Sequence, residues 1–592
     1  MPAKPLLLRL LTLGGFLNAV LPAAAGSRPA IELATGWRFS AGDDAARARP
    51  DFDDRAWSPI RVGVSWTNAG HPDLHGYAWY RVRFKVPAKW KSLPRVREAD
   101  GLMLDLGPVD DVDETFVNGE RIGATGVFPP DYRTAWWEPR GYLVPARLVA
   151  WGGTNVLAVR VYDGQGSAGI TGNPVLRPVE DRDRVSAALV LDPANGFVPA
   201  GREITVTMRL GNSAKSPVKG VMECEWRTDD AAKPALLKKE SRPVGIGAGG
   251  GTAETFAFKP GSAGVYPVRL RLALADGGSV EKSVMPVYDP DHVTRAPNLP
   301  RDFDRFWRAR LADLAKVPPE TSITPRPDLS TTSVSASLVE MRSYRGVRIR
   351  GWLTVPKSKG PFPGMLMVPG YGSEMQPATG VDYAVVLALN IRGHGNSKQD
   401  LDPGDGEYMY IGLGPDPADY VYAGAYMDCI RGVDVLCSQP SVDAGRIAVT
   451  GGSQGGGLTF AAAALDSRIT ACAADVPWLG DWPDYATTAP WSIEEFPKLL
   501  AKRHDLTMDS ILRFLSYFDT MNLADRIKCP VLVSMGLRDD VCPPRIVLCT
   551  YNQIRALKEI RSYPDGDHGG GSEVHDAIRD AWLRRALSRK SS

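Results

Sequence analysis

The stretch that most restricts the fold of this chain is Arg446–Gly457, with the sequence RIAVTGGSQGGG. Its apolar run, Ile447–Thr450, predicts a buried strand that ends in a glycine-rich turn around Ser453, and a small-residue helical pattern begins at Leu458. A G-x-S-x-G turn between a strand and a helix is so tight that the neighbours of the serine must lack side chains. The serine hydroxyl then projects from the carboxyl end of the strand. The pattern therefore predicts that Ser453 is a nucleophile.

The residues after about position 290 alternate between apolar runs and helical patterns. The predicted strands are Val347–Val355, Met365–Val368, Ala384–Asn390, Ile447–Thr450, Ile469–Ala474 and Val531–Met535. The predicted helices cover Phe303–Leu314, Asp419–Leu436, the residues after Ser453, Pro544–Leu557 and Val574–Leu587. Strands that are almost continuously apolar and separated by helices are typical of a parallel sheet covered on both faces. We therefore expect an α/β hydrolase domain over residues 291–592.

A serine nucleophile needs a base, and the base needs a carboxylate that orients it. In an α/β hydrolase both follow the serine in the chain, the acid first. Two histidines lie beyond the predicted strand Val531–Met535: His568 in a glycine-rich loop, and His575 in the last helical pattern, where a surface histidine is the ordinary explanation. His568 is therefore the candidate base. Asp539 and Asp540 both follow the strand, and their spacing does not choose between them as the acid.

The residues before position 290 show the period of two that is typical of half-buried strands. Tyr80, Val82, Phe84 and Val86 alternate with charged residues, and Asn118-Gly119 between two such runs is a tight-hairpin signal. Short strands separated by turn signals predict antiparallel sandwiches. We expect a jelly-roll β-sandwich over residues 26–180 and an immunoglobulin-like β-sandwich over 181–290, in which no chemistry is apparent.

The first of these segments resembles the sugar-binding jelly roll, a galactose-binding-like fold, at the front of glycoside hydrolase family 2 enzymes. The similar segments are Gly36–Phe39, Asp51–Trp57, Trp79–Arg81, Phe116–Gly119 and Asn155–Arg160. The resemblance implies the fold more than sugar binding, because many such domains only pack against a neighbour. Trp66, Tyr77, Trp136 and Trp137 are candidates for stacking on a sugar ring, and buried packing is the alternative for each.

The last half of the chain resembles carbohydrate esterase family 7, the acetyl xylan esterases and cephalosporin C deacetylases. The similar segments are Pro300–Trp307, Gly370-Tyr371, Arg392–Gly395, Arg446–Gly457, Asp475–Pro477, Leu515–Asp519, Lys528–Pro530 and Gly536–Pro544. The resemblance places the acid at the third residue after Gly536, which is Asp539. It also implies an oxyanion hole formed by the backbone N–H groups of Gln454 and Tyr371.

Three features depart from the pattern of that family. This chain has Pro369 where the family usually has histidine, and His394 where it usually has glutamine. The segment between Tyr371 and Ala384 is short, so we expect the helix usual there to be lost or reduced. These changes concern the rim of the substrate pocket and leave the three candidate catalytic residues in place.

The first 25 residues have the features of a secretory signal peptide. Lys4 and Arg9 precede an apolar stretch, Leu10–Leu21, and Ala23–Ala25 offers a small-residue cleavage site. An uncleaved N-terminal anchor is the alternative. We therefore expect a secreted or periplasmic protein. The chain has seven cysteines and a net charge of +2, and we expect neither an essential disulfide framework nor nucleic-acid or membrane binding.

These features predict a secreted carbohydrate esterase that removes acetyl groups from acetylated xylan or xylo-oligosaccharides through an acetyl-serine intermediate. No metal or organic cofactor is required for this chemistry. One alternative is a peptidase of the prolyl oligopeptidase type, but no repeat of propeller-blade length precedes Pro290. A second alternative function is that of a carbohydrate-binding protein whose hydrolase domain has no catalytic activity. A homo-oligomer is possible, since relatives of the catalytic domain often form hexamers, although two added sandwiches would change that packing.

Overall fold

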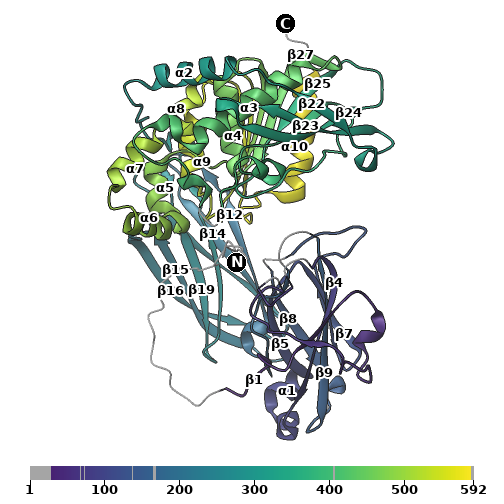
Figure 1. Ribbon diagram of the computed structural model, residues 1–592. Coiled ribbons are helices and arrows are strands. Elements are labelled where there is room, and N and C mark those ends of the chain that lie inside the picture. The colour runs from purple at the N-terminus through teal and green to yellow at the C-terminus, as the bar shows by residue number, and fades with distance from the viewer. Residues whose placement is uncertain are drawn as a thin grey trace.

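The computed structural model describes residues 28–66, 68–71, 74–135, 138–164, 168–404 and 407–588. Two β-sandwiches precede an α/β domain, and Figure 1 shows both sandwiches on the same side of that domain. This is the fold class that the sequence predicts. The candidate signal peptide, residues 1–25, lies outside the described residues. None of the described helices has the length and apolar character needed to cross a membrane.

The first sandwich packs two antiparallel sheets face to face, with strand orders β1-β11-β5-β10, in which β8 also pairs with β5, and β3-β2-β4-β9-β6-β7. Its strands are β1 (Ile31–Glu32), β2 (Arg38–Ala41), β3 (Ser58–Pro59), β4 (Gly76–Lys85), β5 (Gly101–Asp110), β6 (Val112–Val117), β7 (Glu120–Thr125), β8 (Pro139–Pro145), β9 (Thr154–Asp163), β10 (Gly169–Ile170) and β11 (Val175–Pro178). The helix α1 (Pro94–Ala99) lies between β4 and β5. The predicted hairpin joins β6 to β7, and Asn118 and Gly119 both have the positive φ that such a tight turn requires.

The second sandwich packs a three-stranded sheet, β12-β14-β17, against a four-stranded sheet, β16-β15-β19-β20. Its strands are β12 (Val185–Asp192), β13 (Phe197–Val198), β14 (Ile204–Asn212), β15 (Val218–Arg227), β16 (Leu236–Ile246), β17 (Gly251–Phe258), β18 (Gly264–Val265), β19 (Val268–Leu274), β20 (Ser279–Val284) and β21 (Val287–Tyr288). The alternating residues Ile204, Val206, Met208 and Leu210 all point into its core. This burial follows from the period of two in the sequence.

The α/β domain is built on a nine-stranded sheet with the order β22-β23-β24-β26-β25-β27-β28-β29-β30, in which the strands from β26 onward are parallel. The strands are β22 (Ser322–Pro325), β23 (Val334–Arg342), β24 (Arg348–Pro356), β25 (Phe362–Met367), β26 (Val385–Asn390), β27 (Val442–Gly452), β28 (Ile469–Asp475), β29 (Val531–Gly536) and β30 (Lys558–Tyr563). The helices are α2 (Phe303–Ala315), α3 (Val421–Ser438), α4 (Gln454–Leu465), α5 (Trp482–Thr488), α6 (Pro490–Lys502), α7 (Met508–Leu515), α8 (Thr520–Leu523), α9 (Pro544–Gln553) and α10 (Ser572–Ser588). Helix α9 ends four residues before its predicted end, and no helix lies between β25 and β26.

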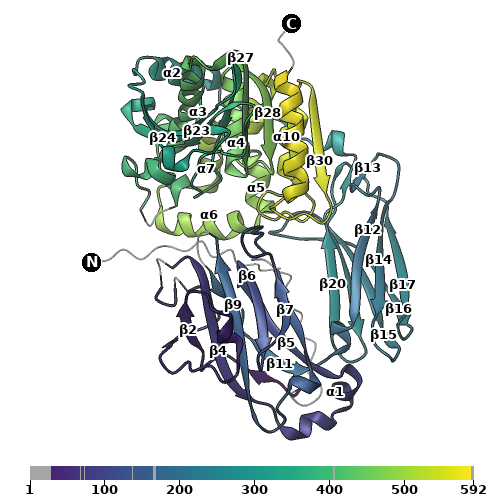
Figure 2. The ribbon, with the colours of Figure 1, turned by 90° about the vertical axis from the view of Figure 1, so that its right-hand side faces the viewer.

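The carboxyl edge of this parallel sheet packs on the second sandwich, as Figure 2 shows from the side. The backbone N–H of Met285 donates to the carbonyl of Leu537, directly after β29, at 2.8 Å. The Ser562 hydroxyl in β30 donates to the carbonyl of Asn195 at 2.7 Å. Arg545 in α9 also forms an ion pair with Asp229 of the second sandwich. The second sandwich is therefore fixed against the edge at which an α/β hydrolase carries its active site.

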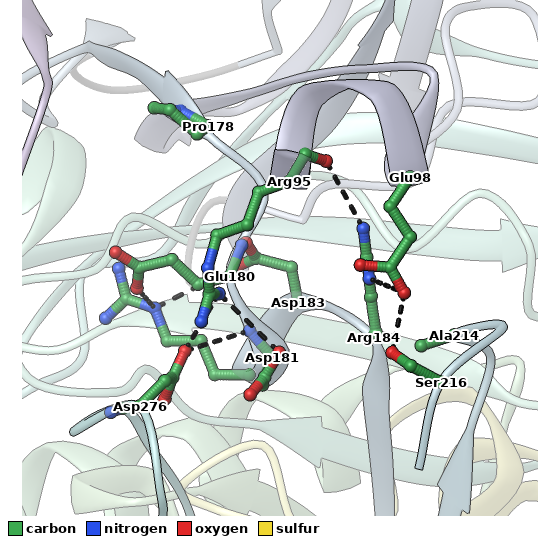
Figure 3. A network of polar contacts seen from close by, with 12 residues as sticks. Arg95, Glu98, Pro178, Glu180, Asp181, Asp183, Arg184, Ala214, Ser216 and Asp276 are labelled. Carbon is green, nitrogen blue, oxygen red and sulfur yellow. Dashed lines mark hydrogen bonds and ion pairs between the residues drawn. The ribbon is translucent and has the colours of Figure 1, made fainter. Parts of the chain in front are cut away.

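A polar network joins the two sandwiches to each other (Figure 3). On α1 of the first sandwich, Arg95 bonds to Asp276 at 3.0 Å, and Glu98 accepts a hydrogen bond from Ser216 at 2.6 Å. Arg184, at the junction of the sandwiches, pairs with Glu98 at 3.1 Å. Because several partly buried charges share these contacts, the network restricts rotation of one sandwich against the other. All three parts are thus held in one arrangement.

Candidate active site

Ser453 lies in the sharp turn between β27 and α4 that the glycine pattern predicts. Its backbone has φ 58° and ψ −120°, a conformation that costs about 1–3 kcal/mol for a residue with a side chain. A Cβ atom at Gly451 or Gly455 would lie 2.7 Å or 2.6 Å from the carbonyl oxygen of Val368. The turn can therefore pack against the end of β25 only because the residues two positions before and two positions after the serine are glycine.

The structure brings Ser453, His568 and Asp539 into one hydrogen-bonded line. Nε2 of His568 lies 3.0 Å from Oγ of Ser453, and Nδ1 of His568 lies 3.0 Å from Oδ2 of Asp539. Asp539 follows β29 and is fully buried, whereas the His568 side chain, in the loop after β30, is about one-third exposed. The order of these contacts is the one a serine nucleophile, its base and an orienting acid require.

Asp539 is the aspartate that faces His568, and its neighbour Asp540 turns away. The other oxygen of Asp539, Oδ1, accepts hydrogen bonds from the backbone N–H groups of Val541 at 2.9 Å and Cys542 at 2.8 Å, which fix the carboxylate. Asp540 is exposed and lines a cavity of about 280 Å³ between the second sandwich and the α/β domain. The acid loop thus has one side toward His568 and one toward the second sandwich.

The surroundings of His568 act on its pKa in opposite directions. Burial lowers the pKa, whereas the hydrogen bond and the charge of the Asp539 carboxylate act against burial and raise it. Burial also raises the pKa of the Cys542 thiol, so this thiol is neutral at pH 7. The Asp539 carboxylate therefore lies where the candidate acid would stabilise positive charge on the His568 ring.

The two predicted oxyanion donors belong to segments that contact each other, since Nε2 of Gln454 donates to the carbonyl of Gly370 at 3.3 Å. Gln454 is the first residue of α4, where backbone N–H groups have no partner within the helix, and Tyr371 is in the turn after β25. Neither backbone N–H donates a hydrogen bond to another residue in the described part of the chain. The positive end of the α4 dipole also favours negative charge at this point.

A buried network that the sequence did not reveal connects these two donors. The Gln454 side chain accepts a hydrogen bond from the Tyr422 hydroxyl at 2.6 Å, and its Nε2 lies 3.0 Å from Nε2 of His394. The same His394 nitrogen accepts the backbone N–H of Gly372 at 3.2 Å, so the ring proton must be on Nδ1, which faces the carbonyl of Arg392. Burial lowers the pKa of His394 to about 4, which keeps the ring neutral at pH 7.

This network gives a testable role to His394, which occupies a family glutamine position. We expect His394→Phe, which lacks an acceptor, to lower kcat on a small acetyl ester by about 10- to 100-fold with little change in KM, because the turn that carries the Tyr371 N–H loses the hydrogen bond made by the next residue, Gly372. His394→Gln should retain most of the activity, since its carbonyl oxygen can accept. Steady-state kinetics and Tm of both variants test this. Equal kcat losses in the two variants would show that ring packing matters, rather than the hydrogen bond.

His575 differs from its sequence interpretation as a surface histidine, because it is only 2% exposed. Its Nε2 lies 2.9 Å from Oδ1 of Asp475, and its Nδ1 lies 2.8 Å from the Tyr563 hydroxyl. The carbonyl of Asp475 accepts the backbone N–H of Ser453 at 2.9 Å. The last helix therefore supports the serine turn from behind through Asp475, a contact that periodicity cannot reveal.

The candidates for sugar stacking in the first sandwich differ in how exposed their rings are. Trp66 is fully buried in the core, so stacking on a sugar is excluded and the packing alternative holds. Tyr77 is half-buried, and its ring lies 4.7 Å from that of Tyr162. Trp136 and Trp137 lie outside the described residues.

Two groups of side chains in the described residues have ligand atoms close enough for a metal ion. They are Asp539, Cys542 and His568, and Asp481, Asp484 and Cys549. The first group is already engaged by the contacts around Ser453. In the second group, the guanidinium of Arg295 lies 2.6 Å from Asp484 and 3.6 Å from Asp481 and supplies positive charge.

The part of the chain that contains this site is the part that matches a known protein family. The family model for acetyl xylan esterase (AXE1) matches residues 287–585, half of the chain. The chain belongs to the acetyl xylan esterase family. Membership makes it a carbohydrate esterase, and residues 287–585 contain Ser453, Asp539 and His568. The curated acetyl esterase Axe7A of Xylanibacter ruminicola is 31% identical over 334 residues, covering 54% of this chain and 75% of the relative.

Two solved structures align with different shares of this member of the acetyl xylan esterase family. The acetyl xylan esterase from Paenibacillus sp. R4 is 30% identical and covers 50% of this chain and 98% of its own, with a TM-score of 0.45. A β-glucuronidase from Bacteroides uniformis is 13% identical and covers 88% of this chain and 66% of its own, with a TM-score of 0.32.

Proposed function

We propose that this protein is an exported esterase that removes acetyl groups from acetylated xylan or xylo-oligosaccharides, with Ser453, His568 and Asp539 as its catalytic triad. The observation that carries the proposal is the continuous line of contacts from Asp539 through His568 to Ser453 at 3.0 Å per step. Family membership supports the choice of an acetyl ester as substrate. The signal-like N-terminus supports export to the periplasm or outside the cell.

The mechanism follows from this geometry. Nε2 of His568 takes the proton of Ser453 as Oγ attacks the acetyl carbonyl carbon, and Asp539 stabilises the imidazolium. The oxyanion that forms accepts hydrogen bonds from the N–H groups of Gln454 and Tyr371. His568 then gives its proton to the departing sugar oxygen, which leaves an acetyl group on Ser453. Water, deprotonated by His568, attacks the carbonyl carbon of this acetyl-enzyme. The bond to Oγ then breaks, acetate leaves, and His568 returns the proton to Ser453.

The two alternative functions require features that differ from this arrangement. A prolyl oligopeptidase-type peptidase would carry a β-propeller before its hydrolase domain, whereas the described residues between 28 and 288 form two sandwiches. A protein that only binds carbohydrate does not require the strained backbone of Ser453 or its contact with His568.

Acetate release from acetylated xylan tests the proposal directly. We expect the purified enzyme to release acetate from acetylated xylan and from acetylated xylo-oligosaccharides, and to hydrolyse acetyl esters faster than butyryl esters of one leaving group. A proline-containing dipeptide anilide serves as the peptidase control and should remain intact. Hydrolysis of the anilide without acetate release from xylan would replace the proposed function with the peptidase alternative.

A further inference from the structure

One turn of the second sandwich contacts both strands that lead to the candidate acid and the candidate base. It spans residues 193–196 between β12 and β13, and we call it the β12–β13 turn. In Figure 2 β13 lies beside β30, and the carbonyl of Asn195 in the turn accepts the hydroxyl of Ser562 in β30 at 2.7 Å. Gly196, the last residue of the turn, lies against the side chain of Leu537, directly after β29.

The second sandwich contacts Leu537 at both its backbone and its side chain. The backbone N–H of Met285 donates to the Leu537 carbonyl at 2.8 Å. The Leu537 side chain is fully buried, and a Cβ atom at Gly196 would lie 2.2 Å from its Cδ1. The position of Gly196 is itself fixed, because its carbonyl accepts the backbone N–H of Val287 at 2.9 Å. A side chain at position 196 would therefore press on Leu537.

Leu537 and its neighbour are also hydrogen-bonded to the segment that carries the candidate base. The backbone N–H of Leu537 donates to the carbonyl of Tyr563 at 2.9 Å. The backbone N–H of Arg538 donates to the carbonyl of Gly566, also at 2.9 Å. Asp539 follows directly, and its carboxylate lies 3.0 Å from the candidate base. A shift of Leu537 therefore changes the distance between acid and base, only two residues away along the chain.

Beyond Leu537, the acid loop borders a cavity. Arg538 and Asp540 line this cavity of about 280 Å³, which lies between the loop and the second sandwich. The α/β domain meets the sandwich again at Arg545, which forms an ion pair with Asp229. Atoms that face a cavity lack contacts on that side, so the loop between these two points is restrained less than at its ends. Leu537 is the end that lies nearer to the candidate acid.

We propose that Leu537 is a positioning residue, through which the second sandwich sets the distance between Asp539 and His568. The inference rests on the proposed function, because it concerns the same triad and deepens the account of how that triad is held. It makes the second sandwich more than a spacer, since the rate of the α/β domain depends on the contact between Gly196 and Leu537.

Two opposite changes at this contact test the inference in the full-length protein. Gly196→Ala adds an atom that presses on Leu537, and Leu537→Ala removes the side chain that rests on Gly196. We expect each change to lower kcat on p-nitrophenyl acetate about tenfold with little change in KM, because a small displacement of a catalytic group slows the chemical step without weakening substrate binding. Normal kcat in both variants would overturn the inference.

Gly201→Ala is the matched control for backbone strain. Gly201 lies in the same sandwich with φ 85°, against 73° at Gly196, but a Cβ there would meet nothing within 4 Å. Alanine is strained at both positions, and only position 196 adds the contact with Leu537. The control should keep normal kcat, and Tm of each variant establishes that it is folded. An equal loss of kcat in Gly201→Ala would assign the effect to strain and overturn the inference.

Rescue by a complementary pair distinguishes positioning from general damage. Gly196→Ala with Leu537→Val moves one carbon atom from position 537 to position 196 and removes Cδ1, so the summed side-chain volume is nearly conserved. We expect this double variant to regain most of the kcat that Gly196→Ala loses. Losses that simply add would show that the two positions do not act through their contact.

The pH dependence of kcat/KM gives a readout that a merely structural role would not change. Asp539 raises the pKa of His568, so a displaced carboxylate should lower that pKa and move the acid limb of Gly196→Ala to lower pH. The limb should return in the complementary pair. An acid limb that stays in place while kcat falls would contradict positioning of the acid.

The choice of substrate separates this inference from the proposed function. Hydrolysis of p-nitrophenyl acetate depends on the triad, whereas acetate release from acetylated xylan also depends on the natural substrate. If the parent protein hydrolyses the small ester but not xylan acetate, the proposed substrate is wrong, and the variants still decide the role of Leu537. If xylan is deacetylated by the parent and by Gly196→Ala and Leu537→Ala at equal rates, the positioning role is wrong and the esterase proposal stands.

Discussion

Replacing Ser453 with alanine should abolish acetate release from acetylated xylan and from small acetyl esters, lowering kcat by about 10⁵-fold or more. The effect is large because the serine, base and acid act as one unit, and loss of the nucleophile removes the covalent route altogether. The residual rate would reflect binding and the two N–H donors alone. Acetate assay and single-turnover kinetics measure the loss.

Ser438→Ala is the matched control for this change. Ser438 is an exposed serine at the end of α3, and its hydroxyl bonds only to neighbouring groups of its own chain segment. The control should keep full activity, and both variants should keep the Tm of the parent. A fluorophosphonate probe should label the parent and the control but not Ser453→Ala. Retained hydrolysis in Ser453→Ala would remove Ser453 from the mechanism, whatever the family resemblance implies.

Local rules explain why the serine turn was predictable from the sequence. The turn is specified by glycines at fixed offsets, since Gly451 and Gly455 leave no room for a Cβ beside Val368. His568 followed from chain order and from the scarcity of histidines near the C-terminus. The choice of Asp539 over Asp540 needed the family resemblance, because neighbouring residues in a loop carry no periodic signal of direction.

Contacts between residues far apart in the sequence explain what could not be predicted. His394 meets Gln454 only because β26 and β27 flank β25 in the sheet, and no pattern in either segment marks the pairing. His575 is similar, since a helical position near the C-terminus reveals nothing about Asp475, 100 residues earlier. For Trp66 the sequence left both sugar stacking and core packing open, because aromatic composition alone does not distinguish a ring in the core from one at a binding surface.

Replacing Asp539 with asparagine should lower kcat by about 10³- to 10⁴-fold while leaving the protein folded. The asparagine amide would donate to Nδ1 of His568 and favour the tautomer with its proton on Nε2. In that tautomer Nε2 can no longer accept the proton of Ser453, 3.0 Å away. Asp540→Asn, at the adjacent exposed position, is the matched control and should have nearly normal kcat. A similar loss in both variants would point to a disturbed loop rather than to the loss of the acid.

The pH profile of Asp539→Asn provides the sharper test, because it reports the charge of the acid. The proposed base, His568, can accept a proton only when neutral, so we expect kcat/KM to fall as the pH drops below the pKa of its imidazolium. Asp539 contributes to raising that pKa, and its removal should therefore lower it. The acid limb of the profile should move to lower pH even though the maximum rate is far smaller. An unmoved acid limb would mean that another group controls it, and that Asp539 orients His568 without stabilising its charge.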